Sequence, residues 1–239
     1  MRFYPLPRAA RRKAPPAKPG PVLFPRFRKS SACALLVLVG ICARSAFVAG
    51  NDGAQTVRIE EDWEVEIGTP EPAGNAPQII NVFSPRQSLN GAYAVFEVNH
   101  STQPTYSAGG MQLQCWIGDE NVDYCSSVEG HALETADELI SYTLTMSLRS
   151  DSLLFEVRNG QSETWGPFGD QEILRQAVPF ASGTLAGYSP QSSVKNSRVG
   201  YARHRVKRYE LKRVRYILDN GEVIVDDTPR LVSENSESE

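Results

Sequence analysis

The sequence ISYTLTMSL at residues 140–148 has an apolar or aromatic side chain at every second position, and each intervening residue is a serine or a threonine. Successive side chains of a β-strand point to opposite faces. This period of two therefore places Ile140, Tyr142, Leu144, Met146 and Leu148 on one face and the hydroxyl side chains on the other. We predict a strand that covers a hydrophobic core on one face only.

The same alternation recurs on both sides of this segment. Apolar residues take alternate positions in residues 57–67 (with Glu61 as the one break), 94–98, 111–117 and 153–157, and residues 209–218 are a further candidate strand. Asn-Gly pairs at 90–91, 159–160 and 220–221 adjoin such segments, and this dipeptide favours the positive φ angles of tight hairpin turns. The last pair predicts a hairpin over residues 209–225.

Helix is expected to be scarce, because short helical patterns occur only at residues 132–139 and 171–176. A chain of many short strands and little helix folds as a β-sandwich or a barrel. We predict an all-β domain over residues 51–232. The polar, acidic residues 233–239 are predicted to be a disordered tail.

Residues 1–50 differ in composition from the rest of the chain. Residues 1–30 carry nine Lys and Arg and no acid, residues 32–43 are an apolar run that ends at Arg44, and small residues follow up to Gly50. A spanning helix needs about 20 apolar residues, so this run is too short to be one and suits the core of a signal peptide. We predict an N-terminal export signal that is cleaved, and a product that is secreted, periplasmic or held in the cell envelope. The alternative is an uncleaved anchor, which would be the chain's contact with the membrane.

Removal of residues 1–50 changes the charge balance. The whole chain has 25 Lys and Arg against 28 Asp and Glu, and the ten cations of the leader leave 15 against 28, or about −13. Such an acidic domain is not expected to bind nucleic acid. Residues 195–215 are the exception, with nine cations and one acid; the candidate basic patch comprises Arg198, Arg203, Arg205, Lys207 and Arg208. The cations of residues 195–215 either neutralise the charge of an acidic strand, such as residues 60–66, or bind an anionic polymer.

Two of the four cysteines, Cys115 and Cys125, lie in the predicted domain. Because exported domains favour disulfides, we predict a bond between them that closes the short segment 116–124. Structural zinc takes four nitrogen or sulfur ligands, so two cysteines with no nearby histidine do not suit a zinc site.

The segment YSPQSSVKNSRVGYARHRV at residues 188–206 resembles the late part of concanavalin A-like jelly rolls, the superfamily of lectins, glucanases and laminin-G-like domains. AGGMQLQCW at residues 108–116 and VRNG at residues 157–160 lie where such folds place a sheet strand and a hairpin. The resemblance implies a two-sheet antiparallel sandwich of two Greek keys, which in many members binds glycans on a concave face. The resemblance does not identify which residues of this chain would bind a sugar or a metal ion.

The sequence offers little support for catalysis. Hydrolases of that superfamily carry Glu-x-Asp-x-x-Glu on one strand; the nearest match is Glu60 and Asp62, and Val65 takes the place of the third acid. We expect these acids to form a solvated face. The histidines are scattered and no Gly-x-Ser-x-Gly motif accompanies them, so a hydrolase triad is not indicated.

Two groups of residues are candidates for ligand binding. Exposed aromatic rings stack on sugar faces, and four lie in or beside predicted loops: Trp116, Tyr124, Trp165 and Phe168. Calcium takes six to eight oxygen ligands, and four donors are close together: Asp119, Glu120, Asn121 and Asp123. The alternatives are a packed turn at residues 165–169 and a polar hairpin tip at residues 119–123.

The function that the sequence favours is a non-enzymatic, exported domain that binds carbohydrate or another cell-surface partner. No cofactor is expected, with calcium as the one candidate. A polysaccharide-degrading hydrolase or lyase of the same fold is one alternative. A structural envelope protein that holds an anionic polymer through residues 195–215 is another.

Overall fold

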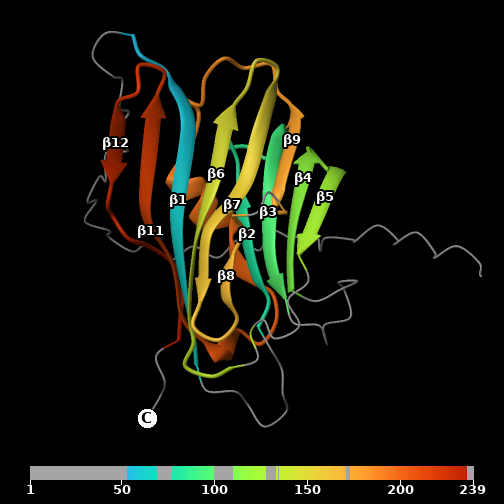
Figure 1. The fold of residues 1–239 in the computed structure, drawn as a ribbon, viewed down its shortest axis with the longest axis vertical. Helices are drawn as coiled ribbons and strands as arrows, with labels where there is room; N and C mark the ends of the chain where they lie inside the picture. The colour runs from blue at the N-terminus through green and yellow to red at the C-terminus, as the bar shows by residue number, and fades with distance from the viewer. Residues whose placement is uncertain are drawn as a thin grey trace, which may run out of the picture. The chain divides into compact units, whose positions relative to one another are not determined.

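The computed structural model describes residues 53–68, 77–99, 110–127, 133, 135–170 and 173–235. The predicted export signal, His100 and His131 lie outside these residues. The described strands form two antiparallel sheets that pack face to face, which confirms the predicted all-β sandwich (Figure 1).

The larger sheet has eight strands, in the order β12-β11-β1-β6-β7-β8, with β13 also paired to β11 and β9 also paired to β7. Their bounds are β1 Thr56–Ile67, β6 Leu139–Leu148, β7 Ser152–Ser162, β8 Gly166–Phe168, β9 Arg175–Pro179, β11 Val206–Leu218, β12 Val223–Asp226 and β13 Arg230–Glu234. Strand β6 is the segment with the regular alternation, and it lies between β1 and β7 in the middle of the sheet.

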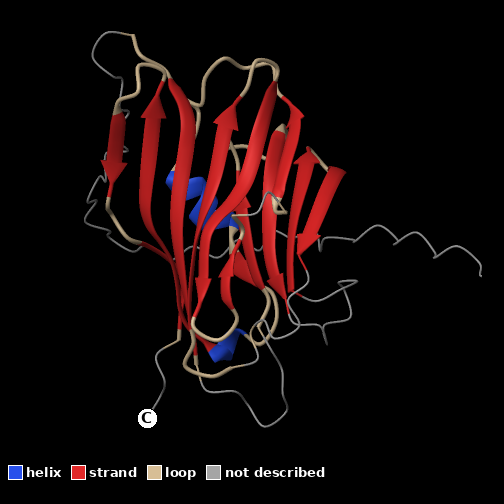
Figure 2. Ribbon diagram, viewed as in Figure 1, coloured by secondary structure: helices blue, strands red, loops and turns tan. Residues whose placement is uncertain are grey.

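The smaller sheet has five strands in the order β10-β2-β3-β4-β5. Their bounds are β2 Ile79–Phe83, β3 Ala92–Asn99, β4 Gly110–Ile117, β5 Glu120–Ser127 and β10 Arg198–Val199. The short helix α1, Pro190–Asn196, precedes β10, and a 3-10 turn at Arg203–Arg205 leads into β11 (Figure 2).

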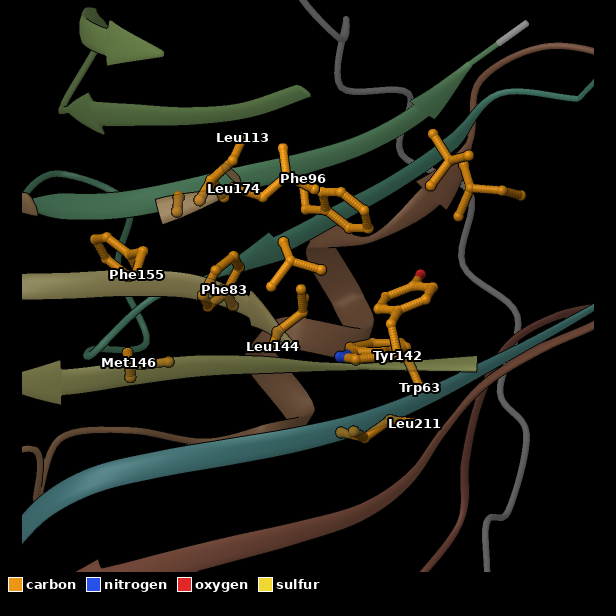
Figure 3. Close-up of a cluster of buried hydrophobic side chains, with 14 of the residues drawn as sticks. Trp63, Phe83, Phe96, Leu113, Tyr142, Leu144, Met146, Phe155, Leu174 and Leu211 are labelled. Carbon is orange, nitrogen blue, oxygen red and sulfur yellow. The ribbon is translucent and has the colours of Figure 1, made fainter. Parts of the chain in front are cut away.

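Aromatic side chains from the two sheets meet in the core (Figure 3). Phe83 of β2 meets Phe155 of β7 edge to face, with ring centroids 5.1 Å apart, and Phe96 of β3 meets Tyr142 of β6 at 5.2 Å. Such geometries suit the quadrupoles of aromatic rings and add to the gain from burying their area. These contacts fix one sheet against the other.

Several predictions about local structure are wrong. Residues 135–137 form bends, Leu139 already belongs to β6, and Arg175 begins β9, so neither helical pattern forms a helix within the described residues. The helix forms instead at Pro190–Asn196. Ser233 and Glu234 belong to β13, so an ordered strand extends into the predicted tail.

The Asn-Gly pairs also have different roles. Asn220-Gly221 forms the turn of the β11–β12 hairpin, as predicted, with Gly221 at φ 87°. Asn159-Gly160 lies inside β7, where the register with β6 shifts and Asn159 has φ 50°. A residue with positive φ serves a β-bulge as well as a turn. A Cβ at Gly160 would lie 2.4 Å from the Phe168 ring, so glycine is required there by close packing.

Among the described residues, no helix has the length and apolarity that crossing a bilayer requires.

Candidate functional site

The outer face of the smaller sheet gathers aromatic and amide side chains. In β4, Met111, Leu113 and Cys115 point into the core, so the intervening Gln112, Gln114 and Trp116 point outward. The cross-strand register then sets their neighbours: Tyr93 of β3 lies opposite Trp116, and Tyr124 of β5 lies opposite Gln114. The adjacent strands β3, β4 and β5 therefore share one polar, aromatic surface, which we call the amide-aromatic face.

Gln114 is the centre of a side-chain hydrogen-bond network on this face. Its amide nitrogen donates to Glu97 at 3.0 Å and to Gln112 at 2.7 Å. Its amide oxygen accepts from the indole nitrogen of Trp116 at 3.1 Å and from Asn121 at 3.2 Å. Gln112 extends the network to Ser126 at 3.2 Å. Both polar ends of Gln114 are thus occupied, and the Trp116 indole is held in one orientation.

Trp116 and Tyr93 form a nearly parallel aromatic pair. Their ring centroids are 6.2 Å apart and the ring planes differ by 10°. Both rings are partly exposed, and Tyr124 is 60% exposed on the neighbouring edge strand. Burial, and then the negative charge of Asp119, raises the pKa of the Tyr93 hydroxyl, so it stays a hydrogen-bond donor at neutral pH.

The four predicted aromatic ligands do not form one site. Trp116 and Tyr124 lie on the amide-aromatic face. Trp165 and Phe168 belong to the turn before β8 and to β8 itself, where their rings stack at 4.9 Å. Phe168 is buried and also contacts Tyr142 in the core. These two residues close the edge of the core as a packed turn.

The candidate calcium ligands do not converge. Asp119 lies in the β4–β5 turn, Asn121 points outward to Gln114, and Asp123 accepts a hydrogen bond from the Tyr124 backbone at 2.8 Å. Within the described residues, no group of three or more His, Cys, Asp or Glu side chains is arranged to hold a metal ion.

The structure overturns the predicted disulfide, because Cys115 and Cys125 are free thiols. Cys115 lies opposite Asp123 and Cys125 lies opposite Leu113, so the two cysteines are diagonal neighbours across the β4–β5 ladder. Diagonal Cβ atoms are typically about 7–8 Å apart or somewhat closer, whereas a disulfide needs about 3.5–4.5 Å. Backbone hydrogen bonds between β4 and β5 close this segment in place of a covalent bond.

The basic strip of residues 195–215 is mostly paired with acids. β11 lies directly beside the acidic strand β1, and Lys212 pairs with Glu210 at 2.7 Å and with Glu64 at 3.4 Å. The residues of the candidate patch are dispersed: Arg208 pairs with Glu210, Lys207 with Asp137, Arg203 donates to Ser233, Arg205 is buried, and Arg198 is exposed on β10 of the other sheet. This arrangement agrees with internal compensation of an acidic strand.

The nearest match to a glycosidase motif is committed to ion pairs. Arg215 donates to both oxygens of Asp62 at 2.7 and 2.8 Å and to Glu60 at 2.7 Å. Thr143 also donates to Asp62 at 2.8 Å. The side chains of Glu60 and Asp62 face outward, but their carboxylate oxygens accept these hydrogen bonds and are not available to act on a glycosidic bond.

Glu61, the one break in the predicted alternation of β1, is fully buried. The hydroxyl groups of Ser193 and Tyr188 donate to one carboxyl oxygen at 2.5 and 2.7 Å, and the Trp63 indole donates to the other at 2.9 Å. The alternation of β1 is therefore unbroken: Glu61 shares the inner face with Ile59 and Trp63. Burial, which outweighs these hydrogen bonds, raises the pKa of Glu61 above 4.5.

A concavity lies on the outer face of the larger sheet. It has a volume of about 520 Å³ and is lined by polar side chains of β1, β6 and β11, among them Asp62, Glu64, Thr143 and Lys212. Most of these groups already pair with one another, and no exposed aromatic ring lines it. It is a polar groove without a stacking surface.

Sequence reasoning found Trp116 and Tyr124 and missed Tyr93, Gln112 and Gln114. The spacing Gln112-x-Gln114-x-Trp116, on the parity opposite the core residues of the same strand, is the signal that could have found two of them. Comparison of the chain with protein-family models and with curated proteins gives no match.

Proposed function

We propose that this domain is a non-enzymatic carbohydrate-binding module that uses the amide-aromatic face. A pyranose ring has an apolar face of C–H groups and a rim of hydroxyl groups. The Tyr93 and Trp116 rings offer apolar area to the C–H face of the sugar. The amide and carboxyl groups around Gln114 offer hydrogen-bond donors and acceptors to its hydroxyl groups.

The observation that carries the proposal is the hydrogen bond from the Trp116 indole to Gln114 within the wider amide network. An exposed tryptophan free to rotate loses conformational entropy when it binds a ligand. A ring that its neighbours already hold loses less, so more of the contact energy appears as affinity. The network thus supports a preorganised stacking surface.

The resemblance to concanavalin A-like sandwiches supports the same class of ligand. The leader of residues 1–50 supports export, which would bring the domain to extracellular or envelope glycans. Intact-mass measurement of the product recovered outside the cell tests this part separately. A product that remains in the cytosol with its leader attached would contradict it.

The test of the binding proposal is Trp116→Ala in the full-length chain. Aromatic residues at the centre of a binding surface commonly contribute about 2 kcal/mol or more, which corresponds to about 30-fold in Kd. We therefore expect binding to a neutral polysaccharide, identified on a glycan array, to weaken by about 30-fold or more. Trp116 points away from the core, so the variant is expected to fold, which a thermal unfolding curve checks.

Tyr201→Ala is the matched control. Tyr201 is 43% exposed and lies after β10, at the opposite edge of the smaller sheet. Its loss should leave binding unchanged. If no glycan is bound by the wild-type chain, or if both variants bind equally well, the proposed face is not the site.

The polar groove on the larger sheet supports one second candidate, a hydrolase or lyase. Its volume of about 520 Å³ lies within the range of small-molecule sites. Release of reducing or unsaturated sugar from a polysaccharide, lost in Asp62→Asn and retained in Trp116→Ala, would favour this candidate over the first.

A further inference from the structure

Arginine side chains gather around a small cavity on the outer face of the larger sheet, apart from the amide-aromatic face. The cavity has a volume of about 260 Å³, and its cationic lining consists of Arg58, Arg149, Arg158 and Arg175. These residues come from β1, the turn after β6, β7 and β9. They are far apart in the sequence, and strand pairing brings them together.

The cavity lining carries more positive than negative charge. Four guanidinium groups face two carboxylates, Glu156 and Asp170. Arg175 pairs with Glu156 at 3.5 Å, and Asp170 accepts hydrogen bonds from the backbone nitrogen of Asn159. Neither Arg149 nor Arg158 forms an ion pair with any residue that the structure describes. Arg58 pairs with Glu60 at 2.7 Å. The guanidinium groups of Arg149 and Arg158 are therefore the two at this cavity that no residue described by the structure neutralises.

Buried polar atoms without partners lie in the same region. The Nε of Arg58 and the side-chain oxygens of Thr145 and Ser147 are buried and have no hydrogen-bond partner among the described residues. In the register of β1, β6 and β7, Ser147 lies opposite Arg58, and Thr145 lies opposite Glu156, on the same outer face. A buried polar group without a partner costs about 1–3 kcal/mol. Of these three groups only Arg58 lines the cavity, whereas Thr145 and Ser147 lie beside it on β6. The unpartnered Nε of Arg58, a buried donor at a cationic cavity, points to a ligand that accepts hydrogen bonds.

We propose that this cavity binds a tetrahedral oxyanion, the sulfate or phosphate group of a ligand. Guanidinium groups reach the cavity from four chain segments, so donors approach from several sides. A tetrahedral oxyanion presents acceptors in several directions, whereas the two oxygens of a carboxylate lie in one plane. The volume is below the range of about 300–1,000 Å³ that holds whole drug-sized ligands, which suits a single charged group.

The site is independent of the proposed glycan-binding face, because the two lie on the outer surfaces of different sheets. The shared chemistry is the oxyanion, which is either a free ion or an ester on a sugar. Inorganic sulfate, inorganic phosphate and glucose 6-sulfate distinguish these sources, with glucose as the uncharged comparison.

The experiment follows the thermal unfolding midpoint of the full-length chain while sulfate replaces chloride at constant ionic strength. A ligand that binds only the folded state raises the midpoint in a saturable manner. We expect such a rise for the wild-type chain, with an apparent Kd at least tenfold weaker in Arg158→Gln and in Arg149→Gln. A tighter response to glucose 6-sulfate than to sulfate would identify a sulfated sugar as the ligand, and the reverse would identify the free oxyanion.

Arg198→Gln is the matched control, since Arg198 is an exposed arginine on β10 of the other sheet. It should respond as the wild type does, and so should Trp116→Ala. Sulfate also stabilises proteins generally by exclusion from their surface. A rise that is linear and equal in all variants, or no rise at all, would overturn the proposal.

Discussion

At the scale of single residues, Glu61 is the most unusual feature of the core. Its carboxyl group is inaccessible to solvent and is held by three neutral donors from β1 and from the segment that contains α1. Tyr188 and Ser193 of that segment both donate to this side chain on the inner face of the larger sheet, and Tyr188 also meets Tyr216 of β11 edge to face. The carboxyl group thus positions α1, at the cost of placing an ionisable group in an apolar environment.

Burial raises the pKa of Glu61 from 4.5, so between pH 4.5 and the folded-state value the folded protein binds more protons than the unfolded chain. The contribution of Glu61 to stability is therefore fully present below pH 4.5 and falls as pH rises through the folded-state pKa. The slope for one proton is at most about 1.4 kcal/mol per pH unit. We therefore compare the free energies of unfolding of the wild type and of Glu61→Gln, measured in urea from pH 4 to 8. The wild-type value minus the variant value is expected to decrease as pH rises.

Glu66→Gln is the control for this comparison, because it removes a carboxyl group from the outer face of the same strand. If the difference in free energy of unfolding between the wild type and Glu61→Gln stays constant from pH 4 to 8, burial of this carboxyl group has no consequence for stability.

At the scale of elements, the pairing of β1 with β11 matches an acidic strand with a basic one. Arg215 joins two acids of β1 through three hydrogen bonds, and its side chain is 24% exposed. Arg213, on the same strand, pairs with Asp227, and both of these side chains are largely exposed. The two arginines therefore provide one partly buried ion-pair network and one surface pair for comparison.

We expect Arg215→Met to destabilise the fold by about 1–2 kcal/mol at pH 7, and Arg213→Met by less than about 0.5 kcal/mol. Hydrogen bonds to charged groups contribute about 1.5–3 kcal/mol when buried, and partial exposure reduces that figure, whereas surface pairs contribute little. Urea unfolding of both variants measures the difference. Equal losses would indicate that the network around Arg215 is no stronger than an exposed pair.

Local sequence predicted the elements whose pattern is set by one buried face. Strands β1 and β6 and the β11–β12 hairpin follow from alternation and from Asn220-Gly221. Arg175 and Gln176, at the end of the second helical pattern, could not be assigned in this way, because their backbone pairs with β7, about 20 residues earlier in the chain. The start of α1 did carry a local signal, since Ser189-Pro190 combines a favoured N-cap residue with proline in the first turn.

The candidate site was only half predictable for the same reason. Aromatic type alone singled out Trp116 and Tyr124. Gln114 and Tyr93 acquire their role through cross-strand neighbours, which depend on the register of β3, β4 and β5. The sign of the charge at residues 195–215 was plain in the sequence, but its neutralisation depends on β1, about 150 residues earlier in the chain.

At the scale of the whole molecule, the two thiols report on the opening of the sandwich. Cys115 is fully buried, and burial raises its pKa to about 12, while Cys125 on the edge strand is partly exposed. Because the thiolate is the reactive form, alkylation of Cys115 requires that β4 leave the core. We expect iodoacetamide to label Cys125 first, and Cys115 at a rate that rises with urea in parallel with global unfolding.

Peptide mass spectrometry measures each thiol and separates both from Cys33 and Cys42. A peptide in which Cys115 and Cys125 are linked, or equal labelling rates under native conditions, would contradict the structure on this point.

The position of β1 between β6 and β11 has a consequence for the order of events during synthesis. β1 is the first strand of the described domain, and one of its two neighbours begins only at Val206. A nascent chain that has completed strands β1 to β10 but not β11 still holds β1 with one unpaired edge. Contacts this distant in the sequence are slow to form, so the nascent polypeptide is expected to remain incompletely folded, and open to chaperones, until β11 emerges.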